Sequence, residues 1–351
     1  MLRRCCASVL ARASGASGAS PAAYSTVSSA ADVAARVDRY DTFLLDCDGV
    51  LWTAEDLLPR TVPALAALRD AGKQLVFVTN SSLRSRDEFA QKFAHYGIEA
   101  AEAELVPSTF AVAQHVKTHH RHVKRAFVMG AAGLRAELEA VGVEAIGTES
   151  IPDAPFGSEP DFQRMAAHCA AEAAAGNGVD AVVCGFDFSW NFKSMTYASL
   201  CLQLNPACEL LATSRDAFDE VRFSTADGGE RSAKLPAMTA VLALLESTTG
   251  RTAAVLGKPS AQLASYMHGV YGYDKARTCI VGDRLDSDIL FGHNGGIDSV
   301  LVMTGTTSRE MLAALAPESP MYPTHVMEQF GLLAGAAGVA IPDAAAAAAG
   351  K

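Results

Sequence analysis

Short apolar runs alternate with longer amphipathic stretches along most of the chain. The apolar runs at residues 42–45 and 74–78 have the length of buried strands, and an amphipathic stretch at 62–71, ended by Gly72, lies between them. This order predicts a βαβ unit, which builds parallel sheets covered by helices. Further helices in this part of the chain are predicted at 86–96 and 108–117.

The stretch from about residue 123 to residue 251 starts the alternation again, so it is predicted to be a second α/β domain inserted into the first. Apolar runs at 254–256, 278–281 and 299–302 are each followed by a turn and a helix, which indicates that the first domain then resumes. The fold class is therefore predicted to be α/β, with a Rossmann-like, doubly wound parallel sheet as its core. Within the insert, strands are predicted at 126–129 and 181–184, and helices at 165–175, 197–203 and 235–247.

The two ends of the chain differ in composition from the rest. The first 30 residues contain Arg3, Arg4 and Arg12, many Ala and Ser, and no acidic residue, which is typical of an organelle transit peptide. The alanine-rich end is expected to be a tail without function. The predicted division is a transit peptide at 1–30, the first domain at 31–122 and 252–340, the insert at 123–251, and the tail at 341–351.

The overall composition is that of a globular protein large enough for two domains, with 351 residues, 50% hydrophobic and 19% charged. A formal net charge of -10 disfavours nucleic acid and anionic membrane surfaces as partners. No apolar run reaches the ~18 residues of a membrane span. The eight cysteines have neither zinc-site nor disulfide-framework spacing. His115, His119, His120 and His122 alternate with Lys and Arg, so a solvated basic surface is expected there rather than a metal site.

Polar clusters follow the predicted strands of the first domain, where ligands bind in such sheets. Asp46 and Asp48 come directly after an apolar run that has no packing reason to end in two carboxylates, and these repel each other unless a cation or proton intervenes. Gly49 permits close approach of the backbone to a ligand, and Cys47 is interpreted as a small apolar residue of the buried strand. The other clusters are Thr79 with Asn80, Lys258 within 257–260, and Asp283 with Asp288.

These residue types belong together in phosphoryl transfer. A phosphate monoester is a dianion, so a carboxylate nucleophile approaches it only when Mg²⁺ and a fixed cation such as Lys258 cancel the charge. The Thr79 hydroxyl, the Asn80 amide and nearby backbone N–H groups are expected to bind the phosphate oxygens. Asp46 is expected to attack phosphorus and form an aspartyl-phosphate, while Asp48 protonates the leaving oxygen and later deprotonates the hydrolytic water.

In order and in combination, the clusters resemble the four motifs of the haloacid dehalogenase superfamily of phosphatases, over most of the chain after residue 40. The resemblance implies Asp46 as nucleophile, Asp48 as acid/base, and Lys258 as charge stabiliser. It also implies phosphate binding at Gly49, Thr79, Asn80 and Ser81, and Mg²⁺ binding by Asp46, by Asp48 through its backbone carbonyl, and by Asp283 with Asp288.

Segments 46–52, 79–82, 185–187 and 291–296 are similar to the branch that contains phosphoglycolate, 4-nitrophenylphosphate and pyridoxal phosphate phosphatases. That branch carries an α/β cap, so the insert is expected to close over the site, and a homodimer through the cap is implied. The chain departs from the usual pattern at 213–216 and 230–234, both in the part that reads the leaving group. Arg215 is a candidate for binding a substrate carboxylate, and a surface arginine is the simpler alternative.

The expected function is a Mg²⁺-dependent phosphatase of a small phosphorylated metabolite. The first candidate substrate is 2-phosphoglycolate, because an organelle leader joins a branch that includes this activity; the chloroplast stroma is favoured over the mitochondrial matrix. The alternatives are glycerol 3-phosphate, pyridoxal phosphate and a broad 4-nitrophenyl phosphate activity. A catalytically idle phosphate-binding scaffold is disfavoured by the complete motif set, and a dehalogenase or phosphotransferase is disfavoured by Asp48.

Overall fold

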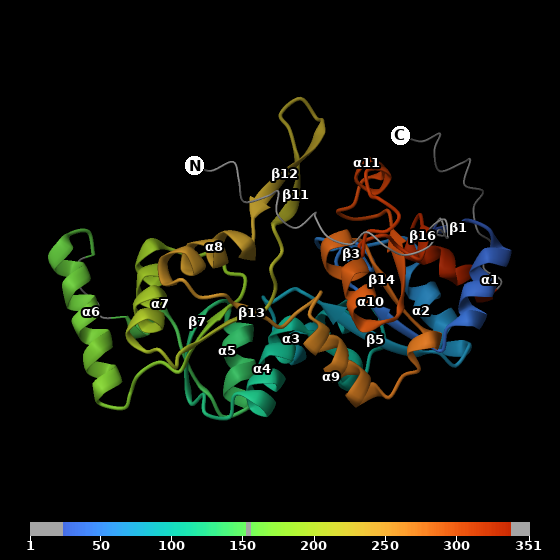
Figure 1. Ribbon diagram of the computed structural model, residues 1–351. Coiled ribbons are helices and arrows are strands. Elements are labelled where there is room, and N and C mark those ends of the chain that lie inside the picture. The colour runs from blue at the N-terminus through green and yellow to red at the C-terminus, as the bar shows by residue number, and fades with distance from the viewer. Residues whose placement is uncertain (1–23, 152–155, 338–351) are drawn as a thin grey trace, which may run out of the picture.

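The computed structural model describes residues 24–151 and 156–337, which form two α/β domains joined by short connections (Figure 1). Most of the expected transit peptide and the expected tail lie outside the described residues. Within the described ranges, no helix has the length and apolarity needed to cross a membrane. The cysteines of this part are buried and free: Cys47, Cys169, Cys184, Cys201, Cys208 and Cys279.

The first domain is built on seven parallel strands in the order β1-β16-β15-β14-β2-β5-β6. The chain runs outward from the central β2 through β5 to β6, and later returns to β14 on the other side of β2. This doubly wound order confirms the predicted fold class. The strands are β1 (Ser25–Val27), β2 (Thr42–Leu45), β5 (Gln74–Thr79), β6 (Leu105–Pro107), β14 (Thr278–Gly282), β15 (Asp298–Val302) and β16 (His325–Met327).

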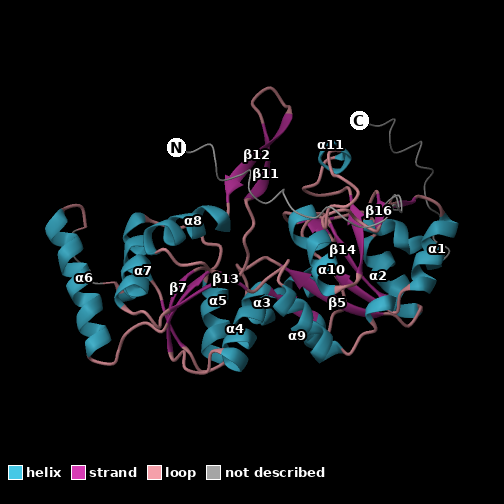
Figure 2. Cartoon of the chain, viewed as in Figure 1, coloured by secondary structure: helices cyan, strands magenta, loops and turns pink. Residues whose placement is uncertain are grey.

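Helices cover both faces of this sheet (Figure 2). Because side chains alternate along a strand, Phe43 and Leu45 pack against one helical layer and Leu44 packs against the other. The first layer contains α1 (Ala30–Arg39), α2 (Thr61–Asp70), α3 (Arg86–His95) and the 3₁₀ helix η5 (Phe330–Ala337). The second contains α9 (Ala261–Tyr271), α10 (Leu290–Gly295) and the beginning of α4 (Ser108–His119), and α11 (Arg309–Ala313) lies near the end of the chain.

The second domain, which we call the cap domain, has a five-stranded parallel sheet in the order β13-β10-β9-β7-β8. Helix α5 and the end of α4 pack on one face, and α6, α7 and α8 pack on the other. A hairpin, β11 (Phe218–Ser224) with β12 (Glu230–Pro236), stands out from the cap domain (Figure 1). The other elements are β7 (Arg125–Met129), α5 (Ala132–Ala140), β8 (Glu144–Ile146), α6 (Glu159–Ala174), β9 (Ala181–Cys184), α7 (Phe192–Leu204), β10 (Glu209–Ala212), α8 (Met238–Thr249) and β13 (Ala254–Val255).

Three expectations about boundaries were wrong. Ser25–Val27 forms the edge strand β1, so the folded part begins inside the segment expected to be a leader; its small polar residues hid a strand that pairs only on one side. Strand β13 pairs with β10, so 254–255 belongs to the cap domain and not to the resumed first domain. The helix expected at 235–247 begins at Met238, because Leu235 and Pro236 complete the hairpin strand β12.

Candidate active site

The predicted catalytic residues meet at the carboxyl edge of the seven-stranded sheet. Asp46 follows the central strand β2, Thr79 ends β5, and Asp283 follows β14, and these three strands are neighbours. Lys258 arrives from the loop between β13 and α9. Because all the strands are parallel, their ends bring residues from distant parts of the sequence to one place.

Lys258 lies at the centre of this cluster and is only 1% exposed. Its ammonium is 2.8 Å from Asp46 Oδ1 and 2.6 Å from Asp288 Oδ1. Burial alone would lower the pKa of Lys258, but the Asp288 and Asp46 carboxylates outweigh it and raise the pKa above its ordinary value. The lysine therefore stays charged and holds the nucleophile candidate in place.

Asp46, Asp283 and Asp288 form a buried acidic triad, with one oxygen from each carboxylate within 4.8 Å of the others. Burial and then the Asp288 charge raise the pKa of Asp46 well above its usual range, although Lys258 opposes this. The same two causes raise the pKa of Asp283 to about 7. Three carboxylates against one ammonium leave an excess of two negative charges when all are ionised.

This donor set fits a hard divalent cation. The triad offers only oxygen ligands, which Mg²⁺ prefers, and the excess negative charge matches one divalent ion. Asp283 is held for such a role by the backbone N–H of Thr306, which donates to its Oδ2 at 2.5 Å. The triad is therefore a candidate metal centre, and Mg²⁺ binding by these three residues stays a prediction.

Two glycines leave room for the Asp283 carboxylate. Gly49 has a positive φ of 81°, and a Cβ there would lie 2.7 Å from the Asp283 carboxyl carbon. A Cβ at Gly305 would overlap Oδ2 of the same carboxylate. The loop after β15 thus helps to shape the site, and the Gly49 carbonyl accepts a hydrogen bond from Thr304 Oγ1 at 2.5 Å.

Asp48 lies beside the triad, and its side chain is exposed where Asp46 is buried. Trp52 Nε1 donates to Asp48 Oδ1 at 2.8 Å, and Thr79 Oγ1 donates to Asp48 Oδ2 at 3.4 Å. These two bonds fix the carboxyl group at the mouth of the site, where a leaving group and a water molecule have access. This position suits the predicted acid/base role.

The predicted phosphate-binding residues divide into two groups. The Thr79 hydroxyl lies at the site, where it also accepts a hydrogen bond from the Ser81 backbone N–H at 3.0 Å. The Asn80 side chain instead binds the backbone of Lys258. Its Oδ1 accepts from the Lys258 N–H at 2.8 Å, and its Nδ2 donates to the Lys258 carbonyl at 2.9 Å. Asn80 therefore positions the lysine, a role that the sequence analysis did not anticipate.

Arg215 does not point to a substrate-binding role in this structure. Its guanidinium makes a two-bond ion pair with Glu246, and the residue is exposed. The neighbouring Asp216 connects the cap domain to the core instead. Its carboxylate accepts from Asn80 Nδ2 at 3.2 Å and lies 3.9 Å from Arg284. Asp216 lies in segment 213–216, where the sequence departs from the usual family pattern. Its partner Asn80 could be found only from the fold.

Cys47 lies in the core with no exposed surface, and burial raises the pKa of its thiol well above the usual range. Both observations agree with the interpretation of Cys47 as an apolar residue of the strand end.

Two further residues around the site were not predicted: Arg284, which donates to the Phe218 carbonyl of the hairpin at 3.2 Å, and Thr306. Arg284 follows Asp283 directly in the chain, but its contact with the hairpin depends on the fold. Thr306 belongs to the loop after β15, whose place beside Asp283 depends on the strand order.

The fold and this site define an enzyme with a Rossmann-like core and an inserted cap domain, whose buried lysine and oxygen-only candidate metal centre suit a phosphate dianion. The family described as haloacid dehalogenase-like hydrolase matches residues 43–144, and a HAD-hydrolase-like family matches residues 255–333. Phosphoglycolate phosphatase 1A, chloroplastic, from Arabidopsis thaliana is 35% identical over 288 residues, covering 82% of this chain and 74% of the relative.

Two further proteins show the same relationship. Glycerol-3-phosphate phosphatase from Gallus gallus is 35% identical over 272 residues, covering 77% of this chain and 81% of the relative. The crystal structure of a 4-nitrophenylphosphatase from Thermotoga maritima superimposes with a TM-score of 0.65 at 26% identity, covering 85% of this chain and 98% of that chain. The chain belongs to the haloacid dehalogenase-like hydrolases and is a phosphomonoester hydrolase.

Proposed function

We propose that the protein is a Mg²⁺-dependent phosphatase that works through an aspartyl-phosphate on Asp46, with 2-phosphoglycolate as its substrate. The observation that carries the mechanism is the position of Asp46. Its carboxylate is buried, pairs with Lys258 at 2.8 Å, and shares the triad with Asp283 and Asp288.

In this mechanism Asp46 attacks phosphorus, and the bond from phosphorus to the leaving oxygen breaks. Asp48 gives a proton to that oxygen, and then takes a proton from the water that hydrolyses the acyl-phosphate. Lys258 offsets the negative charge of the phosphoryl group, while the Thr79 hydroxyl, which donates to Asp48 in this structure, turns to donate a hydrogen bond to that group. Bound Mg²⁺, held by Asp46, Asp283 and the Asp48 carbonyl with Asp288 in support, would supply the remaining positive charge.

Two contacts between the domains support a cap that excludes water. The contact between Asp216 and Asn80 joins the cap domain to the loop of the catalytic lysine. Ser82 of the core accepts a hydrogen bond from the Phe186 N–H of the cap domain at 2.7 Å. These contacts bring the cap domain against the site, as required for phosphoryl transfer away from bulk water.

The choice of 2-phosphoglycolate rests on the relatives and the leader. A relative named phosphoglycolate phosphatase shares 35% identity over most of both chains, and the composition of residues 1–30 favours import into an organelle, with the chloroplast stroma ahead of the mitochondrial matrix. Relatives named glycerol-3-phosphate phosphatase and 4-nitrophenylphosphatase keep those substrates as alternatives. Arg215 does not strengthen the choice, because Glu246 already occupies its guanidinium.

The test is phosphate release by the purified full chain, with Mg²⁺ and with EDTA, from 2-phosphoglycolate, glycerol 3-phosphate, pyridoxal phosphate and 4-nitrophenyl phosphate. We expect Mg²⁺-dependent release and a kcat/KM at least about tenfold higher for 2-phosphoglycolate than for the others, a difference of about 1.4 kcal/mol in transition-state binding. Equal kcat/KM values for the four compounds would contradict the choice of 2-phosphoglycolate as substrate and leave the mechanism intact. No release from any of the four would contradict both.

A further inference from the structure

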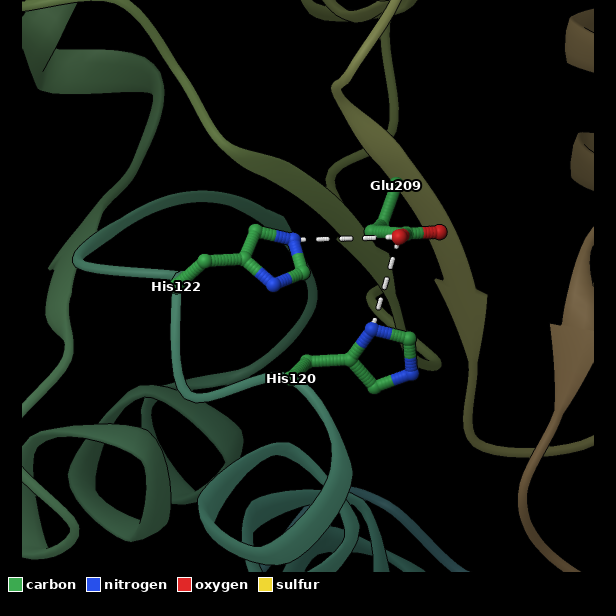
Figure 3. Close-up of side chains that lie close together, drawn as sticks. All are labelled: His120, His122 and Glu209. Atoms are coloured by element: carbon green, nitrogen blue, oxygen red, sulfur yellow. Dashed lines mark ion pairs between the residues drawn. The ribbon is translucent and has the colours of Figure 1, made fainter.

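Three side chains of the cap domain, His120, His122 and Glu209, converge at a place outside the active site. His120 Nδ1 is 3.4 Å from Glu209 Oε1, and His122 Nε2 is 3.8 Å from the same oxygen. Figure 3 shows a nitrogen of each ring turned toward this carboxylate oxygen. One candidate ligand atom from each residue lies within 4.8 Å of the other two.

A tight turn presents the two histidines on the same side. Helix α4 ends at His119, and the His120 N–H still bonds to the Val116 carbonyl at 2.9 Å. The Val123 N–H then donates to the His120 carbonyl at 2.8 Å, which closes the turn around His122 before β7 begins. The other two histidines of this segment, His115 and His119, lie on α4 itself, and their ring centroids are 4.5 Å apart in a stacked arrangement.

Asp180 fixes the turn and Glu209 relative to each other. Its carboxylate accepts hydrogen bonds from the backbone N–H groups of Lys124 at 2.8 Å and Arg125 at 3.0 Å, just after the turn. Its carbonyl accepts from the Glu209 N–H at 2.8 Å, at the first residue of β10. One residue thus anchors both segments that carry the cluster, so the arrangement is part of the fold of the cap domain.

The cluster is separate from the catalytic centre. Glu209 starts β10 and the turn leads into β7, and these parallel strands begin at the same edge of the five-stranded sheet. The segments that reach the active site, such as Ser214 to Asp216 and Lys258, leave the opposite, carboxyl edge. An ion bound by His120 and His122 would therefore not contact the acidic triad.

The donor atoms and their spacing suit a transition metal. With metal–ligand bonds of about 2.0–2.2 Å, two ligands of a tetrahedral ion lie roughly 3.3–3.6 Å apart, so 3.4 and 3.8 Å are close to what a bound ion requires. Two imidazoles and one carboxylate form a set that zinc uses in proteins, whereas Mg²⁺ and Ca²⁺ select oxygen donors.

We propose that His120, His122 and Glu209 form a binding site for a divalent transition-metal ion, for which zinc is the best fit, with water completing the coordination. Arg121 and Lys124 on the same turn are exposed and carry positive charge, so attraction to net negative charge does not drive binding. The coordination bonds of the two imidazoles drive binding instead, and they select zinc over Mg²⁺. The ion ties the connection between the two domains to β10.

The test is equilibrium dialysis of the full chain against Zn²⁺ after removal of metal by a chelator, with millimolar Mg²⁺ present to fill the oxygen-only triad. The expected result is one zinc ion per chain, with affinity lowered roughly tenfold or more by His122→Ala and by Glu209→Gln. His122 has a half-exposed side chain, so its removal leaves the fold intact, as circular dichroism checks. His119→Ala is the matched control, because its ring stacks on His115 outside the triplet, and it should retain the wild-type affinity.

Co²⁺ gives a second readout that does not depend on affinity. Bound to two imidazoles and a carboxylate, it should show visible absorption of a four-coordinate site, lost in His122→Ala and kept in Asp283→Asn. The proposal would be overturned if zinc binding were lost in Asp283→Asn and unchanged in His122→Ala, since the ion would then occupy the catalytic triad. Equal losses in His122→Ala and His119→Ala, or no zinc bound at all, would also overturn it.

Discussion

Replacing Asp283 by Asn should stabilise the metal-free protein while it removes the response to Mg²⁺. Burial, followed by the charge of Asp288, raises the pKa of Asp283 from 3.8 to about 7. Between these two pH values the folded protein holds a proton that the unfolded chain has lost, so the stability of the metal-free protein falls as pH rises through this window. At pH 8 the difference amounts to about 4 kcal/mol, at 1.36 kcal/mol per pKa unit.

Asp283→Asn removes this penalty and keeps an oxygen that can accept from the Thr306 N–H. In EDTA at pH 8 we therefore expect a free energy of unfolding up to about 4 kcal/mol higher for the variant, shrinking to about 2 kcal/mol at pH 5. Mg²⁺ at about 100 times its dissociation constant should raise the free energy of unfolding of the wild type by about 2.7 kcal/mol, and that of the variant by far less.

Urea unfolding followed by circular dichroism measures the free energy of unfolding of both proteins in EDTA at pH 8, in EDTA at pH 5 and in Mg²⁺. Asp286→Asn is the matched control, because Asp286 lies in the helical turn just after Asp283, with its side chain 52% exposed and outside the triad. It should shift stability by less than about 1 kcal/mol. The reasoning would be refuted if Asp283→Asn were no more stable than the wild type in EDTA at pH 8, or if the gap were the same at pH 5.

Three further perturbations test other parts of the structure. Gly305→Ala should lower kcat and weaken Mg²⁺ activation roughly tenfold or more by pushing the Asp283 carboxylate aside; Gly269→Ala, whose Cβ meets nothing, should not, and equal activities of the two variants would contradict this. Lys258→Met should destabilise the metal-free protein by about 3–5 kcal/mol at pH 8 and less at pH 5, where Asp46 and Asp283 with their raised pKa values take up protons. A pH-independent loss in urea unfolding would argue against this. Burial lowers the pKa of His325 from 6.5 to about 4, so the wild type should lose up to about 3 kcal/mol of stability as pH falls through that window. His325→Gln should lose less stability over the same pH range. An identical dependence of the free energy of unfolding on pH in both proteins would contradict the lowered pKa of His325.

The catalytic residues could be predicted from the sequence, because the chemistry restricts which residue types can stand at the ends of these strands. Asp46, Lys258 and Asp283 were all identified from apolar runs that end in charged residues, and the structure brings these three together. Asn80 was also found, but its hydrogen bonds to the Lys258 backbone depend on how two loops meet, which the pattern along one chain does not contain.

The expectations that differed from the structure share a physical cause. Ser25–Val27 is a short strand with little hydrophobic signal, whereas Ala254–Val255 lies in an apolar run that was expected to be a strand but was assigned to the other domain. Each strand is placed by its partner in another segment. The cluster of His120, His122 and Glu209 likewise joins a turn and a strand that are far apart in the sequence. Local composition could predict which segments fold, but pairing between distant segments decided where the domains divide.

The central claim, that Asp46 is the nucleophile of a Mg²⁺-dependent phosphatase, is tested most directly by comparing the wild type with Asp46→Asn. The measurement is phosphate release from 4-nitrophenyl phosphate, in Mg²⁺ and in EDTA, with circular dichroism to verify the fold. We expect release by the wild type only with Mg²⁺, and a loss of at least roughly a thousandfold in the variant, equivalent to about 4 kcal/mol of transition-state stabilisation. Substantial Mg²⁺-dependent turnover by a folded Asp46→Asn protein would contradict the account.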